Sequence, residues 1–592
     1  MDDLTQTFKP LDWQIKKSWK FSKLADPRLQ STYVPYKQYN QRQRISKAQN
    51  RLVVTCSLLI LCMMAIFLRL TEVILWKGTT QIRTTSPVDT NLPIVKRADI
   101  VDRNGVILAT SLPTYSLYAN PREMLDKKDA VEKLMRVFPD LDYQQLLSRL
   151  NSDRSFVWVR RNLSPAQSQI VWRLGIPGLQ FIQEEKRGYP LGALLAHVVG
   201  FADVDNKGLS GIERSFDEYL TNSTDPLRLS IDIRLQHIIR QELTETIKQF
   251  TAVGGVGVLM DIRTGEILAM VSLPDFDPNN PANATSDELF NRPILGVYEM
   301  GSTFKIFNTA LAIDSGVVSI TDQFDAQGPL HVGGFKIHDF NPINRLLTVP
   351  EIMLHSSNIA SARMAMKVGT ERQKIFLEKL GLLDPVSVEL METAKPLYPK
   401  TWRDINTMTI AYGHGIAVTP LHLIVGVSAI VNDGKYYAPT LIARSSRNIN
   451  VIRQVISPQT SRQVRDIMRL VVEKGTGKKA DVAGYYVGGK TGTAEKQVAG
   501  LYQKDARLAS FVSVFPIYEP RYALLVMVDE PKPNASSQGF ATGGWVAAPT
   551  AGRIIQRIAP VLNILPTEKL PLLTSDNYAT SQTGLVNLNG EE

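Results

Sequence analysis

Cysteine is scarce in this chain, since only Cys56 and Cys62 occur among its 592 residues. Both lie inside one uncharged apolar run, so no thiol outside that run can form a disulfide, act as a nucleophile or ligate a metal. The seven histidines show no H-E-x-x-H pattern and no other ligand spacing. These absences argue against a disulfide scaffold, a cysteine enzyme and a metal site, and we expect no cofactor.

Long apolar runs are scarce too, and one segment has the length of a membrane span. Residues 52–68 contain no charged side chain, Arg69 interrupts the run, and residues 70–76 continue it less strongly. A span needs about 17–25 residues, and an arginine and a tryptophan suit the end of such a helix. We predict a single transmembrane helix at residues 51–76. A signal peptide or a buried core helix is the alternative, but for a signal peptide the leader is long and no A-x-A-like cleavage site follows.

Positive charge is in excess only near the start of the chain. The net charge is +10, and residues 1–50 carry more than half of it, with ten basic side chains against four aspartates. The remainder is near balance, which argues against a nucleic-acid-binding body. A basic leader stays on the cytoplasmic side of a membrane. We therefore expect residues 1–50 to form a cytoplasmic tail and the chain after about residue 77 to lie on the other side of the membrane.

The segment after the predicted span, residues 77–230, has no nucleophile–base pair and no glycine-rich phosphate loop. Residues 100–109 favour two short strands joined by an Asn-Gly turn at 104–105. Residues 121–180 are richer in helical periods. We expect a non-catalytic domain that spaces the next domain from the membrane or binds partners.

Residues 231–565 look like a second domain built on a sheet. Apolar segments at 254–261 and 267–273, separated by a short turn, predict a hairpin at its start. Further strands are predicted at 508–515 and 522–529, and a final helix at about 550–562 would return to cover the sheet.

A serine and a lysine three residues apart are the first candidates for chemistry. Ser302 follows a glycine turn, and Lys305 lies one helical turn later on the same face. A lysine whose pKa is lowered by burial can take the proton of a serine hydroxyl, and the start of a helix supplies N–H groups for an oxyanion. Alone this pattern is weak, because a capping serine and a solvated lysine are an ordinary alternative.

Two later segments add candidates of the same kind. Ser356 and Asn358 stand at the start of a helix rich in small residues, where a hydroxyl and an amide can point to one place, although Ser-Ser-Asn is also an ordinary helix cap. Lys490 is flanked by glycines that let a ligand approach the backbone, and its ammonium group suits a carboxylate.

A phosphate-binding loop is the main rival interpretation of the third segment. Residues 484–491 match G-x-x-x-x-G-K-[ST] in every position. That loop needs a buried strand before it and a helix starting at the lysine. Here residues 478–483 include two lysines and an aspartate, which does not suit a buried strand, and Gly492 would break a helix, so we do not expect a nucleotide site.

The three segments in this order resemble the motif set of the penicillin-binding proteins and serine β-lactamases, with Ser357 where that set has aspartate. Residues 97–109 and 211–220 resemble the pedestal motifs of class B penicillin-binding proteins. Residues 298–305 and 411–421 look more like the division branch (FtsI) than the elongation branch. Two departures, Met300 for proline and Ala98 for glycine, touch no catalytic atom.

The resemblance implies an α+β multidomain fold without a glycosyltransferase domain. Its expected parts are a single N-terminal transmembrane helix at 51–76, an elongated mixed pedestal (dimerisation-like) domain at 77–230, a transpeptidase domain at 231–565 with an antiparallel sheet flanked by helices, and a polar C-terminal tail at 566–592.

The activity implied by the resemblance is that of a peptidoglycan D,D-transpeptidase, which cross-links stem peptides ending in D-Ala-D-Ala and is a target of β-lactams. Ser302 would be the nucleophile, Lys305 its base, and Ser356 a proton relay. Asn358 would bind the peptide amide. The terminal carboxylate would be held by the segment Lys490, Thr491, Gly492 and Thr493, and the backbone N–H groups of Ser302 and Thr493 would form the oxyanion hole.

Other functions remain open at this stage. An elongation-type enzyme, a D,D-carboxypeptidase or a β-lactamase would use the same residues, although an anchor and a pedestal disfavour the last two. A β-lactam sensor would need a larger cytoplasmic domain than residues 1–50, whereas a membrane-anchored division scaffold could coexist with catalysis. The expected partners are a SEDS-type glycosyltransferase (FtsW-like) and other division proteins, located at the septum of the bacterial inner membrane.

Overall fold

The computed structural model describes residues 54, 56–69, 71, 96–445, 449–498 and 501–567. The chain divides into two units, residues 1–94 and 95–592.

In the first unit, residues 56–69 form a helix whose apolar side chains are exposed. None of the helices in the described part of the chain is both long and apolar enough to cross a membrane. The predicted transmembrane segment 51–76 is described only in part, and its other residues lie outside the described ranges. The predicted cytoplasmic tail at 1–50 lies outside them as well, as does the predicted polar tail from residue 568 onward.

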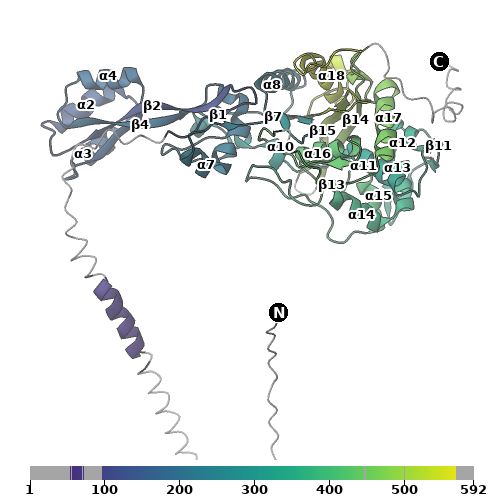
Figure 1. The fold of residues 1–592 in the computed structure, drawn as a ribbon, viewed down its shortest axis with the longest axis horizontal. Coiled ribbons are helices and arrows are strands. Elements are labelled where there is room, and N and C mark those ends of the chain that lie inside the picture. Colours follow the sequence, from purple (N-terminus) through teal and green to yellow (C-terminus); the bar gives the residue numbers. More distant parts are fainter. Residues whose placement is uncertain are drawn as a thin grey trace, which may run out of the picture. The chain divides into compact units, whose positions relative to one another are not determined.

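The second unit contains two five-stranded sheets and several short ladders (Figure 1). Its strands are β1 (Ile100–Val101), β2 (Ile107–Ala119), β3 (Val157–Leu163), β4 (Leu179–Gly188), β5 (Leu227–Arg228), β6 (Gly254–Asp261), β7 (Ile267–Leu273), β8 (Gln323–Asp325), β9 (Leu330–Val332), β10 (Phe335–Ile337), β11 (Leu346–Thr348), β12 (Lys435–Tyr436), β13 (Arg453–Gln454), β14 (Gly488–Val498), β15 (Leu501–Phe515) and β16 (Tyr522–Asp529).

The helices of this unit range from one turn to five. They are α2 (Lys127–Val137), α3 (Tyr143–Leu150), α4 (Pro165–Arg173), α5 (Ala196–Val199), α6 (Gly211–Ser215), α7 (Asp217–Asn222), α8 (Ile233–Gln249), α9 (Ser286–Leu289), α10 (Arg292–Leu295), α11 (Lys305–Asp314), α12 (Val349–His355), α13 (Asn358–Val368), α14 (Thr370–Lys379), α15 (Asp404–Ile410), α16 (Pro420–Val431), α17 (Pro458–Lys474) and α18 (Ala547–Ile558).

The first sheet has the order β3-β2-β1-β5, with β4 paired to β2. The predicted hairpin at 100–109 is confirmed, because β1 and the start of β2 pair antiparallel. Gly105 takes the left-handed conformation (φ +90°) in the turn. The buried Asp102 carboxylate accepts the backbone N–H groups of Asn104 at 2.7 Å and Val106 at 2.8 Å, which closes the loop as an Asx turn.

Helices α2, α3 and α4 pack on one end of β2 around a small core of their own, which includes Leu134, Phe138 and Leu150. The helical periods predicted for residues 121–180 were right for these helices but missed β3, and no strand was predicted at the position of β4. Strand β4 pairs with β2 over its whole length. It has no apolar alternation because only one of its ten side chains is buried.

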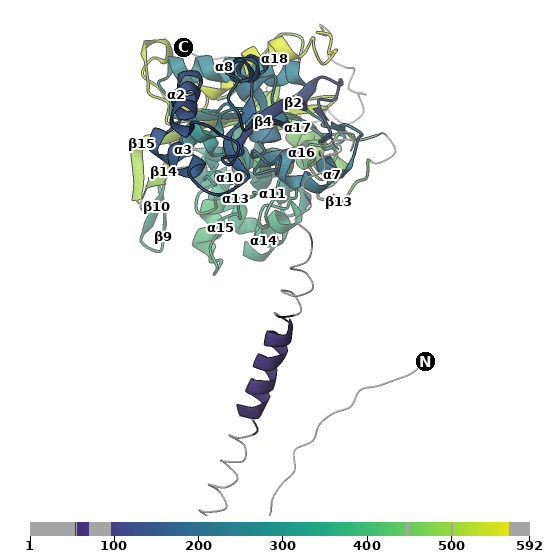
Figure 2. The ribbon, with the colours of Figure 1, turned by 90° about the vertical axis from the view of Figure 1, so that its left-hand side faces the viewer.

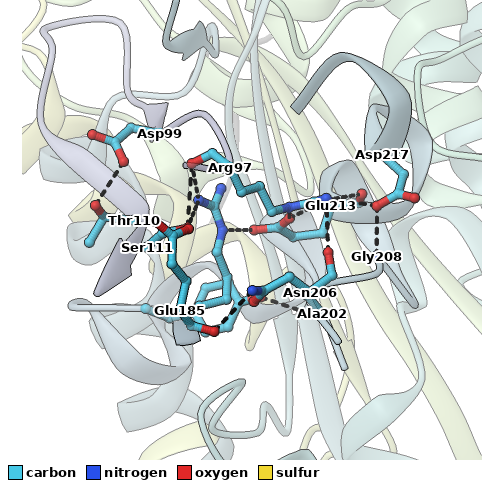
Figure 3. Close-up of polar contacts among 12 residues, drawn as sticks. Arg97, Asp99, Thr110, Ser111, Glu185, Ala202, Asn206, Gly208, Glu213 and Asp217 are labelled. Carbon is cyan, nitrogen blue, oxygen red and sulfur yellow. Dashed lines mark hydrogen bonds and ion pairs between the residues drawn. The ribbon is translucent and has the colours of Figure 1, made fainter. Parts of the chain in front are cut away.

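A buried ionic cluster joins three segments of this domain that lie far apart in sequence (Figure 3). Glu213 has no exposed surface, and its two carboxylate oxygens accept the Nε–H groups of Arg97 at 2.8 Å and Arg187 at 2.6 Å. Arg97 also donates to Asp217 at 2.8 Å and to the Glu213 carbonyl at 2.8 Å. The half-buried Asp217 brings the cluster to two arginines and two carboxylates, and this balance of charge compensates for burying the other three groups.

The second sheet is antiparallel throughout, with the order β14-β15-β16-β6-β7. The predicted strands at 254–261 and 267–273 are confirmed as β6 and β7. The predicted strand at 508–515 is the second half of β15, and the final helix α18 lies a few residues earlier than predicted.

Helices cover both faces of this sheet, so its central strands are buried on both sides. Helices α8 and α18 lie on one face, and α11, α16 and α17 on the other, with α14 and α15 farther out on that side (Figures 1 and 2). Side chains of β16 alternate between the two cores: Ala523, Leu525 and Met527 belong to one, and Leu524, Val526 and Val528 to the other.

Replacing Glu213 by alanine leaves Arg97 and Arg187 buried without their shared carboxylate. We expect a loss of about 3–5 kcal/mol in the free energy of unfolding, measured by urea denaturation. Glu218→Ala, which removes an exposed carboxylate from the neighbouring helix α7, should change it by less than about 0.5 kcal/mol. Equal effects of the two substitutions would contradict the role given to the cluster.

Candidate active site

Ser302 lies in a short 3-10 helix, Gly301–Phe304, that leads directly into α11. Gly301 has φ +55°, so the chain enters the helix through a left-handed turn that glycine adopts without strain. The sequence predicted a helix starting at Ser302, and in the structure the first turn of that helix is a 3-10 turn, which is tighter than an α-helical one. Ser302 and Lys305 still share a face, because residues three apart are eclipsed in a 3-10 helix.

Lys305 is completely buried, and its Nζ atom is the centre of the site. Nζ lies 2.8 Å from Ser302 Oγ, 2.7 Å from the Ser356 carbonyl oxygen, 3.1 Å from Ser356 Oγ and 2.7 Å from Asn358 Oδ1. The structure thus brings together four residues that the sequence placed in two separate motifs.

Burial holds the pKa of Lys305 well below its usual range, and the charge of Lys490 lowers it further, against a smaller opposite effect of Asp339. A neutral amine has two N–H groups and one lone pair. The nearest neighbours, the Ser356 carbonyl and Asn358 Oδ1, can only accept, so they take the two N–H groups. The lone pair is left for a hydroxyl proton, and Ser302 at 2.8 Å is the nearer hydroxyl. Lys305 is therefore arranged as a base toward Ser302.

Ser356 lies between α12 and α13 in the left-handed conformation, with φ 59° and ψ 40°. Its hydroxyl oxygen lies between two lysine amino groups, 3.1 Å from Lys305 Nζ and 2.9 Å from Lys490 Nζ. The next residue, Ser357, caps α13 by accepting the Ala360 N–H at 3.1 Å. The ordinary cap and the site hydroxyl are thus adjacent residues with different tasks.

Lys490 lies on the edge strand β14 and is completely buried. Besides Ser356 Oγ, its Nζ donates to the Thr491 carbonyl at 3.2 Å. Burial lowers the pKa of Lys490 to about 7. Because Lys490 lies on a strand and not at the start of a helix, the segment is not a phosphate-binding loop, in agreement with the expectation from its sequence.

The remaining residues of this segment lie beside the turn that carries Ser302. A Cβ atom on Gly492 would come 2.8 Å from the Met300 carbonyl oxygen, so glycine lets the two backbones pack closely. Thr493 is exposed, and its Oγ1 accepts the Gly543 N–H at 3.0 Å. Thr491 Oγ1 lies 2.8 Å from Thr476 Oγ1, a contact that the sequence did not predict.

The sequence also missed Asp339, a buried carboxylate from the loop after β10. Oδ2 accepts the Ser357 hydroxyl at 2.7 Å, and Oδ1 accepts the backbone N–H groups of Asn358 and, at 3.0 Å, Ile359. A negative charge at the start of α13 is favourable for the helix. Asp339 fixes the loop that carries Ser356, and no local pattern could connect it with residues eighteen to twenty positions later.

Comparison with known proteins gives a consistent result. A model of the penicillin binding protein transpeptidase domain matches residues 255–556, and one of the penicillin-binding protein dimerisation domain matches residues 94–232. The chain is 40% identical over 504 residues to "Probable peptidoglycan D,D-transpeptidase FtsI" of Caulobacter vibrioides, covering 83% of this chain and 85% of that protein. It is 31% identical to "Peptidoglycan D,D-transpeptidase FtsI" of Escherichia coli K12, covering 79% and 84%.

A solved structure with a similar fold is penicillin binding protein 3 of Mycobacterium tuberculosis in complex with ampicillin. It superimposes with a TM-score of 0.64 at 25% sequence identity, covering 80% of this chain and 96% of the other.

Replacing Asp339 by asparagine removes the charge that accepts three hydrogen bonds in the interior. We expect the free energy of unfolding to fall by about 1.5–3 kcal/mol, as for other bonds to charged groups, measured by urea denaturation. The control Asp325→Asn removes a carboxylate that is paired with Arg363 at the surface, at 3.2 Å, and should cost at most about 1 kcal/mol. A loss at Asp339 no larger than that of the control would show that the loop is held by other contacts.

Proposed function

This chain belongs to the FtsI-type class B penicillin-binding proteins, and on that premise we propose that it is a peptidoglycan D,D-transpeptidase whose nucleophile is Ser302. The observation that carries the proposal is the 2.8 Å contact between Ser302 Oγ and the buried Lys305 Nζ, whose lone pair is free for the hydroxyl proton. The substrate is a stem peptide ending in D-Ala-D-Ala, and β-lactams compete for the same serine.

In the first half of the reaction, Ser302 Oγ attacks the carbonyl carbon of the penultimate D-alanine and its proton passes to Lys305. The backbone N–H groups of Ser302 and Thr493 stabilise the oxyanion, and one such donor is worth about 10²–10³ in rate. Ser356, which contacts both lysines, relays the proton from Lys305 to the nitrogen of the departing D-alanine. The product is an acyl-enzyme and free D-alanine.

In the second half, the amine of a neighbouring stem peptide attacks the same carbonyl carbon. Its proton returns through Ser356 to Lys305, the bond between the acyl carbon and Ser302 Oγ breaks, and Ser302 is reprotonated. One new peptide bond is formed for the one that was broken, which is a cross-link.

Substrate recognition uses the remaining residues of the site. Lys490, Thr491 and Thr493, with Gly492 between them, hold the terminal carboxylate. A bound carboxylate favours the charged form of Lys490 and thereby keeps Lys305 neutral. Asn358 binds the peptide amide through its side chain, which is held by the His338 carbonyl at 3.1 Å and by Lys305 at 2.7 Å.

The placement in the cell follows from the apolar run at residues 52–68 and the basic leader before it. We infer a single inner-membrane span at 51–76, a cytoplasmic N-terminus, and a periplasmic pedestal (77–230) and transpeptidase domain (231–565). A pedestal without catalytic residues is suited to contact a SEDS-type glycosyltransferase (FtsW-like) and other division proteins at the septum.

The proposal is tested by intact-mass spectrometry of the full chain, in detergent, after incubation with benzylpenicillin. We expect a stable adduct of one benzylpenicillin on the Ser302 peptide, because β-lactams acylate the serine and the acyl group leaves slowly. Ser302→Ala should form none, since no acyl-enzyme can form without the hydroxyl, whereas the exposed Ser319→Ala should react like the wild type.

Two other results would decide against the proposal. An adduct that forms and disappears within seconds would indicate a β-lactamase. No adduct on a folded wild-type chain would leave only a scaffold role.

The second-order rate constant of acylation should depend on pH through both lysines. A lysine with a lowered pKa is neutral above that pKa, so the rate rises as Lys305 loses its proton. It falls again above a pH of about 7 in the free enzyme, because neutral Lys490 no longer attracts the carboxylate. In Lys490→Arg the cation persists at all these pH values, so the fall should disappear even if the maximal rate is lower. The measurement is the rate of adduct formation across the neutral pH range; an unchanged fall in the arginine variant would exclude Lys490 as its cause.

A further inference from the structure

A carboxylate directly before the nucleophile turn has no role in the mechanism given above. Glu299 Oε1 accepts the Gly415 N–H at 2.8 Å, and Oε2 lies 3.0 Å from His414 Nδ1. The Glu299 side chain is 13% exposed and that of His414 42%. Glu299 therefore connects the nucleophile segment with the tight turn at residues 413–415, where both glycines have φ +79°.

This turn packs directly on the backbone that presents Ser302. The Gly301 N–H donates to the Gly413 carbonyl at 3.2 Å. A Cβ atom on Gly413 would lie 2.2 Å from the Gly301 carbonyl oxygen, and one on Gly301 would lie 2.8 Å from the Thr493 carbonyl oxygen. Residues 413, 301 and 493 thus form three layers of backbone with no side chain between them. A displacement of the 413–415 turn would be passed to Gly301 and change its distance from Thr493.

The other end of the same segment is already fixed. Tyr298 and Val418 exchange two backbone hydrogen bonds, of 3.0 and 2.9 Å. The neighbouring residue Ala417 pairs in turn with Leu397. On the side of α15, the turn is held by bonds from the Gly413 and His414 N–H groups to the carbonyls of Ile410 and Thr409, at 2.9 and 3.0 Å. On the side of the nucleophile, it is held by the Gly301 N–H bond and by the two contacts of Glu299. The contacts of Glu299 are therefore placed where they can set the position of the turn.

We propose that His414 is a positioning residue of the reaction, which holds Glu299 and through it the 413–415 turn against Gly301. The latch formed by Glu299 and His414 fixes the separation of Ser302 and Thr493, whose N–H groups receive the oxyanion. This inference rests on the proposed function. A donor at Nδ1 exists both in the imidazolium and in one neutral tautomer, so the latch needs a ring N–H and not a full positive charge.

The latch should affect the chemical step more than the binding of the ligand. Oxyanion donors act on the transition state, and small misplacements of reacting groups are costly, up to about 10² for 1 Å. Lys490 and Thr491, two of the three side chains that hold the carboxylate, come before Thr493 on β14, and we expect them to keep their contacts. We therefore expect the acylation rate constant to change while the dissociation constant of the preceding complex does not.

The test uses the full chain and benzylpenicillin, and measures the acylation rate constant at saturation and the dissociation constant separately. His414→Ala should lower the rate constant about tenfold with the dissociation constant within about twofold. His414→Asn places an amide N–H near the position of Nδ1 and should recover to within about threefold of the wild type. His237→Ala, at an exposed histidine of α8, is the matched control and should change neither constant.

Glu299→Gln tests the same contact from the other side. Its rate constant should also fall, and combining it with His414→Ala should add little, because both act through one contact. If His414→Ala fails to fold, the acylation rate constants of Glu299→Gln and His414→Asn, each compared with that of the wild type, decide whether the latch exists.

A wild-type acylation rate constant in His414→Ala or Glu299→Gln would overturn the latch. So would an equal fall in the rate constants of His414→Ala and His414→Asn, or additive effects of Glu299→Gln and His414→Ala. A change in the dissociation constant alone would overturn it as well. A wild-type chain that forms no adduct overturns the proposed function, and the latch with it; normal wild-type acylation with unaffected variants overturns the latch alone.

Discussion

The site depends on the burial of two lysine side chains against one hydroxyl oxygen. Nζ of Lys305 and Nζ of Lys490 both lie within 3.1 Å of Ser356 Oγ, and neither lysine has exposed surface. Two ammonium ions cannot both be stable there, because desolvation and mutual repulsion disfavour the second charge. The arrangement therefore keeps Lys305 as the neutral amine, whereas a ligand carboxylate can stabilise the charge on Lys490. Which lysine is neutral and which can carry the charge thus follows from electrostatics before any substrate is bound.

The rest of the domain keeps the two lysine side chains buried. The sheet is covered on both faces, which makes β14 a rigid edge for Lys490, and α11 is buried along most of its length behind Lys305. Around the nucleophile, close contact is made by backbone and not by side chains, since Gly301, Gly413 and Gly492 each leave no room for a Cβ atom. The N–H groups that we propose as oxyanion donors are thus placed by the packing of peptide groups, which have no side-chain rotamers.

Much of this could be predicted from the sequence where the determining contacts are local. Strands β6 and β7 have apolar sequences bounded by a turn, and the pairing of Ser302 with Lys305 follows from a spacing of three on a helix. Strand β4 was missed because its exposed side chains follow no apolar period. Asp339, Thr476 and the contact of Glu299 with His414 were missed because each acts on residues that are distant in sequence, and single-chain patterns carry no information about such pairs.

The left-handed backbone of Ser356 has a consequence for engineering this protein. A non-glycine residue in that conformation costs roughly 1 kcal/mol, and glycine or asparagine would adopt it more easily. A search for stabilising substitutions guided by backbone preference would choose those residues at position 356 and remove the hydroxyl between the two lysines. If Ser356 is the proton relay that we propose, selection for heat resistance without an activity screen would favour variants that have lost activity.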